Sequence, residues 1–540
     1  MSKDDVFSTP FANQIFKQKY SMDGQETWKD TCTRVVNAVC AQLVDAKTKD
    51  EIFNLMLDRK IIPGGRYLYS AGRPFHQVNN CFLFRAEDTR EGWADALSKA
   101  TASLMTGGGI GFNYSNVRGE GAIIKRTGGK STGPIALMNM INEAGRYVMQ
   151  GGQRRSAIWA GLSWSHSDIK NFLYLKDYSA SLKEAKANDF MFPLPMELTN
   201  ISIDYNTEFF VAIEDEKHPK HLQAKEVWLN NCKQAFKTAE PGMIFNFRKD
   251  NDNLRNACTE VTSEDDSDKC NLGTVWINRC ADRKEFAKAV KYLTLFLLCG
   301  GIYSDIPTDK IREVGSKNNR IGVGLGGIHE WLLQRGYGYE VTPELHKWLS
   351  VYEQESDGMA FIGAKQLGIA VPKGVRAIAP TGTIGIIAET TTGIEPLFCK
   401  AYKRRYFKDG KWVAQLVVDG SVKRLLGMNI DQAKITDSFD LTFKQRVKFQ
   451  ADVQNYVDMS ISSTCNVPYW GSPENNETNV EKNANILLKY AKRLRGFTVY
   501  PDGCREGQPL TRVDLAEALA NEGVIFEDKE SECIGGVCGI

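Results

Sequence analysis

The chain has 540 residues, of which 42% are hydrophobic, and this is enough to bury a large core. Its 68 Lys and Arg residues nearly balance its 66 Asp and Glu residues, so no basic field is available to hold a nucleic-acid backbone. The N-terminus carries no signal sequence, and the longest apolar run, 293–302, is too short to span a bilayer. We therefore expect a cytoplasmic protein that binds neither nucleic acid nor a membrane.

Hydrophobic periodicity predicts the order of the elements along the chain. Residues 1–60 have helical periodicity and predict a helical N-terminal segment. From 61 to about 400, strand-like and helical runs alternate, which favours an α/β architecture with parallel strands. Residues 401–425 predict an irregular excursion, and 443–496 return to helices. The polar, then glycine-rich tail 521–540 has no core-forming pattern and predicts a flexible end.

Three glycine-rich segments invite a nucleotide-binding interpretation. The segment GVGLGG at 322–327 matches G-x-G-x-x-G, but it follows a polar stretch, so a tight glycine turn is preferred over a dinucleotide site. The segment 127–133 ends like a phosphate loop, but Ile124 stands where that loop needs glycine. In 379–396 a strand leads into Thr-Gly-Thr and a helix start, which is either a phosphate cradle or an ordinary turn.

The cysteines are the candidate reactive residues of this chain, because the glycine-rich segments do not identify a reaction. Thirteen cysteines without a secretion signal predict reduced thiols, most of them buried fillers. The segment NACTE places Cys258 and Glu260 at alternate positions, on one face of an extended chain. A carboxylate keeps a nearby thiol protonated, which suits hydrogen-atom transfer rather than nucleophilic attack. Cys270 can pair with another cysteine as a two-electron reductant, and Cys533 with Cys538 predicts an exposed dithiol rather than a metal site.

Together with further blocks, these residues resemble the catalytic subunit of ribonucleotide reductases, most closely the adenosylcobalamin-dependent class II enzymes. The resemblance runs in family order through VNNCFLF, GGGIGFNYSNVRGEGAIIKRTGGKSTGP, QGGQRRSA, NACTE, KCNLGTVWINR, RIGVGLGGIHEWL, APTGTIGIIAETTTGIEP and RGFTVYPDGCREGQ. It implies a ten-stranded α/β barrel with a catalytic finger loop over 61–520, with an effector and dimer region at about 81–160. It also implies reduction of ribonucleoside diphosphates to 2′-deoxyribonucleoside diphosphates for DNA precursor synthesis.

The resemblance also implies a role for each reacting residue. Cys258 would be the thiyl radical that removes the ribose 3′ hydrogen, and Glu260 would be the base on the 3′ hydroxyl. Asn256 would orient the ribose hydroxyls. Cys81 and Cys270 would protonate the departing 2′ hydroxyl and then close to a disulfide.

Other positions would bind the ligands and restore the thiols. A thioredoxin- or glutaredoxin-like protein would reset the tail dithiol, which itself would reopen the active-site disulfide. A nucleoside triphosphate effector, a dNTP or ATP, would bind at the specificity site. The carried-over positions are Asn80, Thr381, Gly382, Thr383 and Ile384 for the substrate, Asp88, Arg118, Gln153, Arg154 and Arg155 for the effector and its relay loop, and Cys533 and Cys538 for the dithiol.

Several residues depart from the family pattern. Ala257 and Thr259 stand where the family usually has Pro and Gly, so the finger loop is expected to differ in shape. Ser156 stands where the relay loop commonly has glycine, so effector rules need not transfer. Asn80 replaces a frequent serine beside the substrate. No N-terminal ATP-binding cone is visible, and we expect no overall control by ATP and dATP.

The source of the thiyl radical is inferred from a tyrosine that is absent at position 499. Class I enzymes use two adjacent tyrosines near the C-terminus, but here Val499 precedes Tyr500, which favours adenosylcobalamin over a partner subunit. No Asp-x-His-x-x-Gly cobalamin motif and no protein-held metal site is predicted. A homodimer using diphosphates is expected, because no inserted segment imitates a dimer partner. The alternatives are a class I-type subunit that needs a radical-generating partner, a non-catalytic nucleotide-binding homologue, and a dehydrogenase built on GVGLGG.

Overall fold

The computed structural model describes residues 6–148, 156–189, 192–408, 411–504, 510–522 and 524–527. It begins with three helices, and their N-caps Thr9, Thr27 and Asp45 each accept a hydrogen bond from the first turn. Their apolar faces join the core that also covers one side of the barrel. The predicted helical N-terminal segment is confirmed as α1 (Pro10–Lys19), α2 (Trp28–Cys40) and α3 (Ala46–Leu57).

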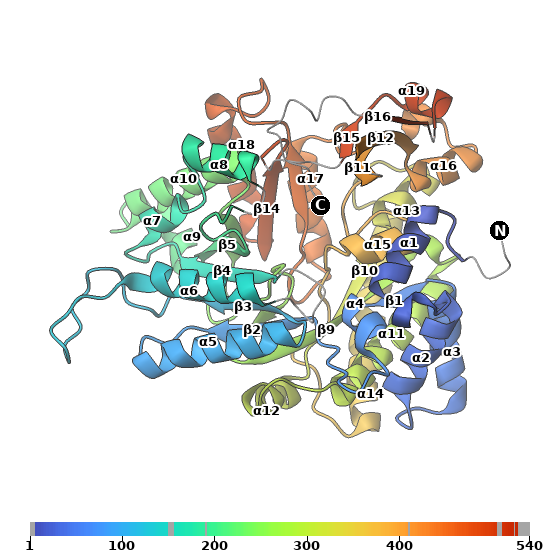
Figure 1. The fold of residues 1–540 in the computed structure, drawn as a ribbon, viewed down its shortest axis with the longest axis horizontal. Helices are drawn as coiled ribbons and strands as arrows, with labels where there is room; N and C mark the ends of the chain where they lie inside the picture. The colour runs from blue at the N-terminus through green and yellow to red at the C-terminus, as the bar shows by residue number, and fades with distance from the viewer. Residues whose placement is uncertain are drawn as a thin grey trace.

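Five parallel strands, β2 to β6, form the first half of the barrel (Figure 1). Parallel neighbours need crossover connections, and helices supply them while covering the outer face. The strands are β2 (Cys81–Arg85), β3 (Gly109–Asn113), β4 (Ile158–Ser163), β5 (Thr199–Tyr205) and β6 (Gly242–Phe245). The helices are α5 (Arg90–Met105), α6 (Gly133–Tyr147), α7 (Ile169–Leu173), α8 (Ala180–Asn188), α9 (Thr207–Glu214) and α10 (His221–Thr238).

The second half has five parallel strands: β9, β10, the short segment 376–378, the segment that runs from Ile461 into β13, and β14. β10 pairs with β9, and single bridges join β10 to Arg376 and Ile378 to Ile461. β13 pairs with β14. The halves meet antiparallel, at β9 with β2 and at β14 with β6. The ring therefore closes, and the predicted ten-stranded α/β barrel is confirmed. The named strands are β9 (Asp268–Trp276), β10 (Ile321–Gly326), β13 (Thr464–Val467) and β14 (Gly496–Pro501).

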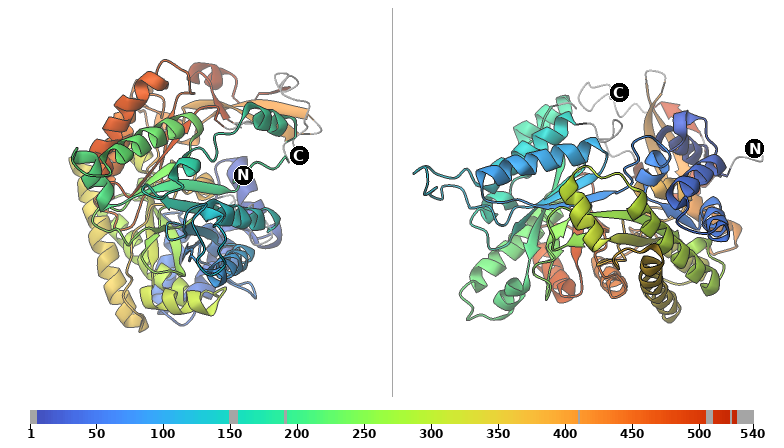
Figure 2. Two further views of the ribbon diagram at one scale, coloured as in Figure 1. Left: turned by 90° about the vertical axis from the view of Figure 1, so that its left-hand side faces the viewer. Right: turned by 90° about the horizontal axis from the view of Figure 1, so that it is seen from below.

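Helices also cover the second half, and α14 packs on α11 at the outside of the molecule (Figure 2). α11 is long and apolar enough to cross a membrane, but 61% of its apolar window is buried in the protein, as in a core helix. β1 (Ile61–Pro63) pairs with the free part of the β9 edge and leads into α4 (Gly65–Ser70). The helices of this half are α11 (Arg283–Tyr303), α12 (Asp309–Asn318), α13 (Ile328–Gln334), α14 (Pro343–Leu367), α15 (Gly382–Ala388), α17 (Phe443–Gln454) and α18 (Glu477–Ala491).

Residues 322–326 of this segment lie in strand β10, and Gly327, with φ +74°, makes the turn from β10 into α13. The predicted glycine turn therefore applies to Gly327 alone, and the other glycines lie in a strand. A Cβ at Gly322 would lie 2.1 Å from Leu272, and one at Gly326 would lie 2.4 Å from Trp276. The glycines therefore let side chains of β9 pack against β10. Every residue of β10 is buried, which leaves no open turn for a dinucleotide phosphate.

The segment 401–425 is also more regular than predicted. It forms the antiparallel pair β11 (Ala401–Lys408) and β12 (Lys411–Val418), followed by α16 (Gly420–Gly427). The run of basic residues obscured the strand pattern, although Asp409-Gly410 is a typical hairpin dipeptide. β15 (Leu510–Arg512), β16 (Ile525–Glu527) and α19 (Leu515–Ala520) complete this small sheet region, which lies beside the barrel (Figure 1).

Candidate active site

A short hairpin enters the barrel and carries the NACTE segment at its tip. β7 (Leu254–Arg255) pairs antiparallel with β8 (Thr262–Ser263), and β7 lies against β2, β3 and β4. Glycine at position 111 of β3 makes room for it, because a Cβ there would lie 1.9 Å from the carbonyl oxygen of Arg255. The predicted finger loop is therefore present, and its flanking apolar residues belong to a small cluster with Cys81 and Cys270.

Hydrogen bonds fix the shape of the loop despite the two unusual residues. The side-chain oxygen of Asn256 accepts a bond from the Val261 N–H at 3.0 Å, and the Asn256 carbonyl accepts one from Thr259 N–H at 3.0 Å. Thr259 has φ +69°, a left-handed conformation that glycine adopts without cost. The loop thus keeps a glycine-type turn with threonine in place. The Ala257 carbonyl is held by Asn200 at 3.2 Å.

Cys258 and Glu260 differ sharply in their surroundings. The Cys258 side chain is exposed at the tip, yet it lies within the barrel, and burial with the Glu260 charge raises the pKa of its thiol well above the usual range. Glu260 is 1% exposed, and its Oε2 has no hydrogen-bond partner among the described residues. Burial raises the pKa of Glu260 to about 7. The pair therefore offers a neutral S–H group beside a carboxyl group poised near neutrality.

Cys81 and Cys270 face each other across two antiparallel strands. They are register partners in the β2–β9 ladder, and directly opposed residues have Cβ atoms about 4.5–5.5 Å apart. A small approach from that spacing allows a disulfide. The side-chain amide of Asn256 donates to Cys81 Sγ at 3.0 Å, so the finger contacts this pair directly. The structure thus brings together Asn256, Cys258, Glu260 and the cysteine pair.

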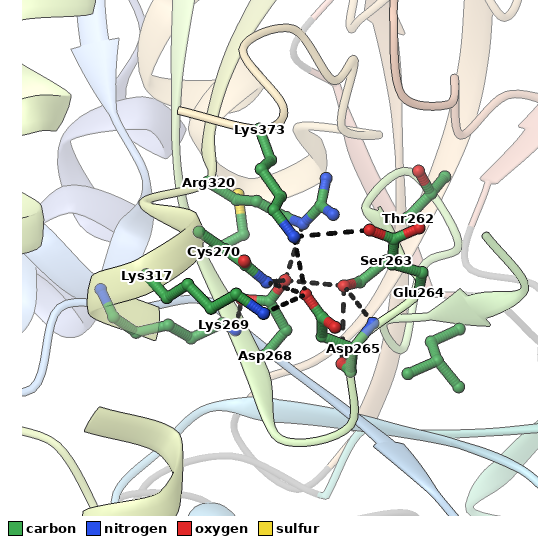
Figure 3. Close-up of polar contacts among 12 residues, drawn as sticks. Thr262, Ser263, Glu264, Asp265, Asp268, Lys269, Cys270, Lys317, Arg320 and Lys373 are labelled. Atoms are coloured by element: carbon green, nitrogen blue, oxygen red, sulfur yellow. Dashed lines mark hydrogen bonds and ion pairs between the residues drawn. The ribbon is translucent and has the colours of Figure 1, made fainter. Parts of the chain in front are cut away.

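The Asp268 carboxylate, beside Cys270, is hydrogen-bonded to the finger, to helix α12 and to the residue that precedes β10. Asp268 lies two residues before Cys270, so both side chains face the same side of β9. Its Oδ2 accepts bonds from Ser263 Oγ at 2.7 Å and from Arg320 Nε at 2.7 Å (Figure 3). It also accepts a bond from Asn318 Nδ2 at 2.8 Å. Burial and then Asp268 raise the pKa of Cys270, while Arg320 opposes them. The sequence predictions missed Asp268, although its i−2 spacing from Cys270 was a usable signal.

The base of the finger rests on a second buried network that sequence reasoning also missed. Arg255 is fully buried and donates to Asn246 Oδ1 at 2.7 Å and to the Asp252 carbonyl at 2.7 Å. Arg495 donates to Asp252 Oδ2 at 2.6 Å. Burial, and then the charge of Arg495, lowers the pKa of Arg255 to about 9. Asn246, Asp252 and Arg255 are close in the chain, but Arg495 is 243 residues from Asp252, so no local pattern predicts its contact.

The segment after residues 376–378 has the geometry of the possible phosphate cradle. Thr381, with φ +48°, precedes α15, and its Oγ1 accepts a bond from Gly393 N–H at 3.0 Å. Gly382 faces open space, and the first-turn N–H groups of a helix have no partner within the helix. Thr383 and Ile384 follow in that turn, half-buried. Ala379, just before, packs against the cluster that contains both opposed cysteines.

Asn80 and the predicted effector residues lie on the first half of the barrel. Asn80 Oδ1 accepts a bond from Leu272 N–H at 3.3 Å beside the cysteine pair. Arg118 Nε lies 2.7 Å from Asp88 Oδ2, and both are partly exposed. Arg118 also borders a polar cavity of about 510 Å³. Ser156 Oγ donates to the Val148 carbonyl at 2.8 Å. Of the remaining predictions, Gln153, Arg154, Arg155, Cys533 and Cys538 lie outside the described residues.

Val499 and Tyr500, which stand where class I enzymes have two adjacent tyrosines, face opposite sides of their strand. Val499 on β14 is buried in the outer core with Phe497, and Tyr500 takes the other face of the strand. Among the described residues no group of three or more His, Cys, Asp or Glu side chains could hold a metal ion. None of the eleven described cysteines forms a disulfide.

Comparison with known proteins gives one consistent family. The family model "Ribonucleotide reductase, barrel domain" matches residues 79–196, 181–347 and 372–500. The vitamin B12-dependent ribonucleoside-diphosphate reductase of Thermoplasma acidophilum is 25% identical over 528 residues, covering 85% of this chain and 65% of the relative. The enzyme of the same name from Mycobacterium tuberculosis is 24% identical over 551 residues, covering 90% and 76%.

A solved structure shows the same fold. The Actinobacillus ureae class Id ribonucleotide reductase alpha subunit superposes with a TM-score of 0.73 at 13% identity, covering 92% of this chain and 97% of that one. The chain spans about two thirds of the length of the Thermoplasma relative. The predicted resemblance is thus confirmed, since the matched residues include the finger, both opposed cysteines and the strands that hold them. The chain belongs to the ribonucleotide reductase barrel-domain family.

Proposed function

We propose that this chain is a class II ribonucleotide reductase that converts ribonucleoside diphosphates to 2′-deoxyribonucleoside diphosphates in the cytoplasm. One observation carries the proposal: an exposed thiol at the finger tip lies beside two opposed cysteines and a buried carboxyl group, whose Oε2 has no hydrogen-bond partner among the described residues. A non-catalytic nucleotide-binding homologue has no use for this redox pair. The names of the two B12-dependent diphosphate reductases support the substrate and the cofactor.

The finger residues start the reaction. Cys258, as a thiyl radical, takes the hydrogen atom from C3′ of the ribose, and Glu260 takes the proton of the 3′ hydroxyl. The raised pKa of Cys258 favours this role, because a protonated thiol is the form that carries a hydrogen atom. A Glu260 pKa of about 7 suits a general base at neutral pH. Asn256 orients the ribose hydroxyls while its amide contacts Cys81.

The opposed cysteines supply the reducing equivalents. Cys81 protonates the leaving 2′ hydroxyl, which departs as water, and the Cys81 and Cys270 thiols together give two electrons and two protons. They close to a disulfide, and Cys258 returns a hydrogen atom to C3′. The tail dithiol, Cys533 and Cys538, then reopens the disulfide by thiol exchange, and a thioredoxin- or glutaredoxin-like protein reduces the tail. Ribonucleotide and dithiol thus become deoxyribonucleotide, disulfide and water.

Adenosylcobalamin fits the site as the radical source. The group supplies, when bound, the one-electron oxidation that turns the Cys258 thiol into a thiyl radical. Cys258 is exposed although its neighbours Ala257 and Thr259 are buried, so its sulfur is the atom that such a group would meet. The outward-facing Val499 in place of a second tyrosine disfavours a class I-type relay from a partner subunit.

The binding residues follow the same proposal. The N–H groups of Gly382, Thr383 and Ile384, with the hydroxyls of Thr381 and Thr383, hold the substrate phosphates. Asn80 contacts the substrate beside the cysteine pair. A dNTP or ATP effector binds at Asp88 and Arg118, and Gln153, Arg154 and Arg155 relay its identity. The proposed domains are a helical segment at 1–60, a barrel at 61–520 that contains the effector region at about 81–160, and a tail at 521–540.

A homodimer is proposed through the two helices of the effector region. α5 and α6 lie side by side at the edge of the molecule (Figure 1). They expose Met105 by 60%, Met140 by 44% and Tyr147 by 84%, and exposed apolar side chains on neighbouring helices favour a protein contact. We expect light scattering to give twice the chain mass in the presence of effector. A monomer under those conditions would contradict the proposal.

The decisive test is anaerobic reduction of CDP by the protein alone, with adenosylcobalamin and dithiothreitol. Formation of dCDP without a second protein is the expected result. Product only after adding a radical-generating subunit would favour the class I-type alternative. CDP binding without any turnover would favour the non-catalytic homologue. A parallel assay with CTP decides between diphosphate and triphosphate.

We expect Gly111→Ala to lower the activity by about 100-fold, because a displacement of about 1 Å at reacting groups costs that much. The added Cβ would lie 1.9 Å from the Arg255 carbonyl, and neither backbone can yield without moving the finger. Gly358→Ala on α14 is the matched control, since nothing lies within 4 Å of its Cβ and alanine favours a helix. Both variants are compared by dCDP formation and thermal unfolding. Full activity of Gly111→Ala would contradict the close fit.

A further inference from the structure

The C-terminal end of helix α15 is held by three arginines from distant parts of the chain. Arg59 Nη1 donates to the Ile387 carbonyl at 3.0 Å, and Arg279 Nη2 donates to the Ala388 carbonyl at 2.5 Å. Arg424 Nη2 donates to the carbonyl of Glu389, the residue that ends the helix. The last carbonyls of a helix have no partner within it and carry partial negative charge. Each of these carbonyls therefore has a guanidinium group of its own.

Two carboxylates balance the arginines. Glu389 adopts a left-handed conformation, φ +55°, at the helix end, and its Oε2 lies 2.7 Å from Arg59. Glu330 is fully buried and binds Arg424 through both oxygens, at 2.9 and 2.7 Å. The cluster thus has three positive and two negative groups. Both carboxylates and Arg59 are largely buried, whereas the Arg424 side chain is 36% exposed. Arg59 and Arg424 are each paired with a carboxylate, whereas Arg279 is placed by its bond to the Ala388 carbonyl, and its buried Nε has no partner among the described residues.

The N-terminal segment is fastened to the same cluster. Ser8 Oγ and Thr9 N–H both donate to Glu389 Oε1, at 2.7 and 2.9 Å. Arg59 Nη2 donates to the Val6 carbonyl at 2.9 Å, so the guanidinium group bridges the segment and the helix. The following helix α1 packs against α15 (Figure 1). Residues about 380 positions apart thus meet at one glutamate.

A helix as short as α15 depends on such contacts for its placement. It has seven residues, and a helix of this length is marginal without tertiary support. Any tilt of the helix axis moves the N–H groups of its first turn, which are the groups assigned to the substrate phosphates. Groups that are held in place before binding spend less of their interaction energy on ordering.

We propose that Glu389 and the arginine cluster are positioning residues for the phosphate helix, and that the docked N-terminal segment, through Ser8 and Thr9, sets the affinity for the substrate phosphates. The inference rests on the proposed function, because it deepens the role of α15 as the phosphate site. It assigns no chemical step to the cluster. Its consequence is that weakening the Glu389 contacts lowers phosphate affinity and leaves the thiol chemistry intact.

The test is Glu389→Gln, compared with wild type for binding of CDP and of cytidine, which lacks phosphate. The amide keeps the shape but loses the charge and one acceptor oxygen, so Arg59 and the N-terminal donors are left imperfectly paired. We expect the Kd and KM for CDP to rise about tenfold, with cytidine binding and kcat at saturating CDP within about twofold. Binding is measured by equilibrium dialysis without cofactor, and turnover with adenosylcobalamin and dithiothreitol.

Glu26→Gln is the matched control. Glu26 pairs with Arg34 at 2.6 Å in the same N-terminal region with similarly low exposure, but it does not contact α15. We expect it to leave CDP affinity within about twofold of wild type. An equal loss of CDP affinity in both variants, or a fall in kcat without a rise in KM for Glu389→Gln, would overturn the proposal. If Glu389→Gln does not fold, the exposed Ser8→Ala, which removes one donor, must still raise the CDP Kd.

Thr383→Ala separates this inference from the proposed function. It removes a hydroxyl from the first turn of α15 without touching the arginine cluster. If Thr383→Ala binds CDP more weakly and Glu389→Gln binds it normally, the phosphate site is supported and the positioning role of Glu389 is contradicted. Unchanged CDP binding by Thr383→Ala and by Glu389→Gln alike would remove the phosphate site itself.

Discussion

Replacing Cys258 by serine is expected to reduce dCDP formation to the background of the assay. A serine O–H bond is too strong to serve as the hydrogen-atom carrier, whereas the substitution changes the volume of the finger tip very little. The Cys258 side chain is exposed, so the variant loses little packing and should keep the melting temperature of the wild type. The measurement is conversion of radiolabelled CDP with adenosylcobalamin and dithiothreitol.

The same variant tests the separation of roles among the cysteines. In pre-reduced wild type, one turnover should consume the Cys81 and Cys270 thiols, which alkylation and mass spectrometry detect. Cys258→Ser should show no such CDP-dependent loss. Cys399→Ser is the control, because Cys399 is buried two residues before β11 of the small sheet region and outside the cluster that holds the opposed cysteines. Product formation by Cys258→Ser, or its loss in Cys399→Ser without unfolding, would contradict the assignment of the radical site.

Replacing Glu260 by glutamine is expected to lower kcat by about 10²–10⁴-fold, the usual contribution of a positioned general base. The wild-type rate should rise with pH through about 7, where Glu260 loses its proton. The variant should have lost this limb of the profile, because glutamine does not titrate there. A pH profile of kcat/KM for CDP reduction measures both effects. An unchanged limb in the variant would assign the titration to another group.

Glu260→Gln should also stabilise the protein at alkaline pH. Burial raises the pKa of Glu260 from 4.5 to about 7, so the folded state retains its proton where the unfolded state has lost it. The stability this gives is complete below pH 4.5 and is lost as pH rises through 7. We expect the variant to unfold with about 1–3 kcal/mol more free energy than wild type at pH 8 and with little difference at pH 5. Equal stability at both values would contradict a buried carboxylate.

A substitution that raises the free energy of unfolding but lowers the activity indicates that burial of the original group, here Glu260, destabilises the folded protein. The Oε2 atom of Glu260 has no hydrogen-bond partner among the described residues, which is unusual for a buried carboxyl oxygen. A substrate hydroxyl is a natural partner. Denaturant unfolding with and without CDP checks this, since substrate should reduce the difference between the two proteins.

Local sequence patterns were sufficient for much of this protein. Alternating strand and helix periodicities predicted the α/β class, because each element buries one face and repeats with its own period. The alternate positions of Cys258 and Glu260 predicted their proximity, since side chains two residues apart share a face in extended chain. The ordered family blocks supplied the opposed cysteines, and the register of β2 with β9 agrees with them.

Local sequence patterns predicted the wrong secondary structure in segments whose conformation depends on contacts with distant strands. The segment 322–327 matches a glycine turn in sequence, but pairing with β9 and packing against Trp276 make residues 322–326 a buried strand, and only Gly327 lies in a turn. Basic residues in 401–425 hid a hairpin whose strands are completed by β15 and β16 from the end of the chain. Propensity is a weak guide when distant strands supply the hydrogen bonds.

The sequence by itself determined the kind of barrel, and through the ordered family blocks it predicted which residues carry the chemistry. Only the tertiary structure decided how these residues are held: Asp268 with Ser263 beside Cys270, Arg255 beneath the finger, and the arginines behind α15. The reason is physical. Buried charges must find partners wherever the fold places them. Asp268 and Arg320 are 52 residues apart, and Arg59 and Ile387 are 328 apart, so such contacts leave no periodic pattern in the chain.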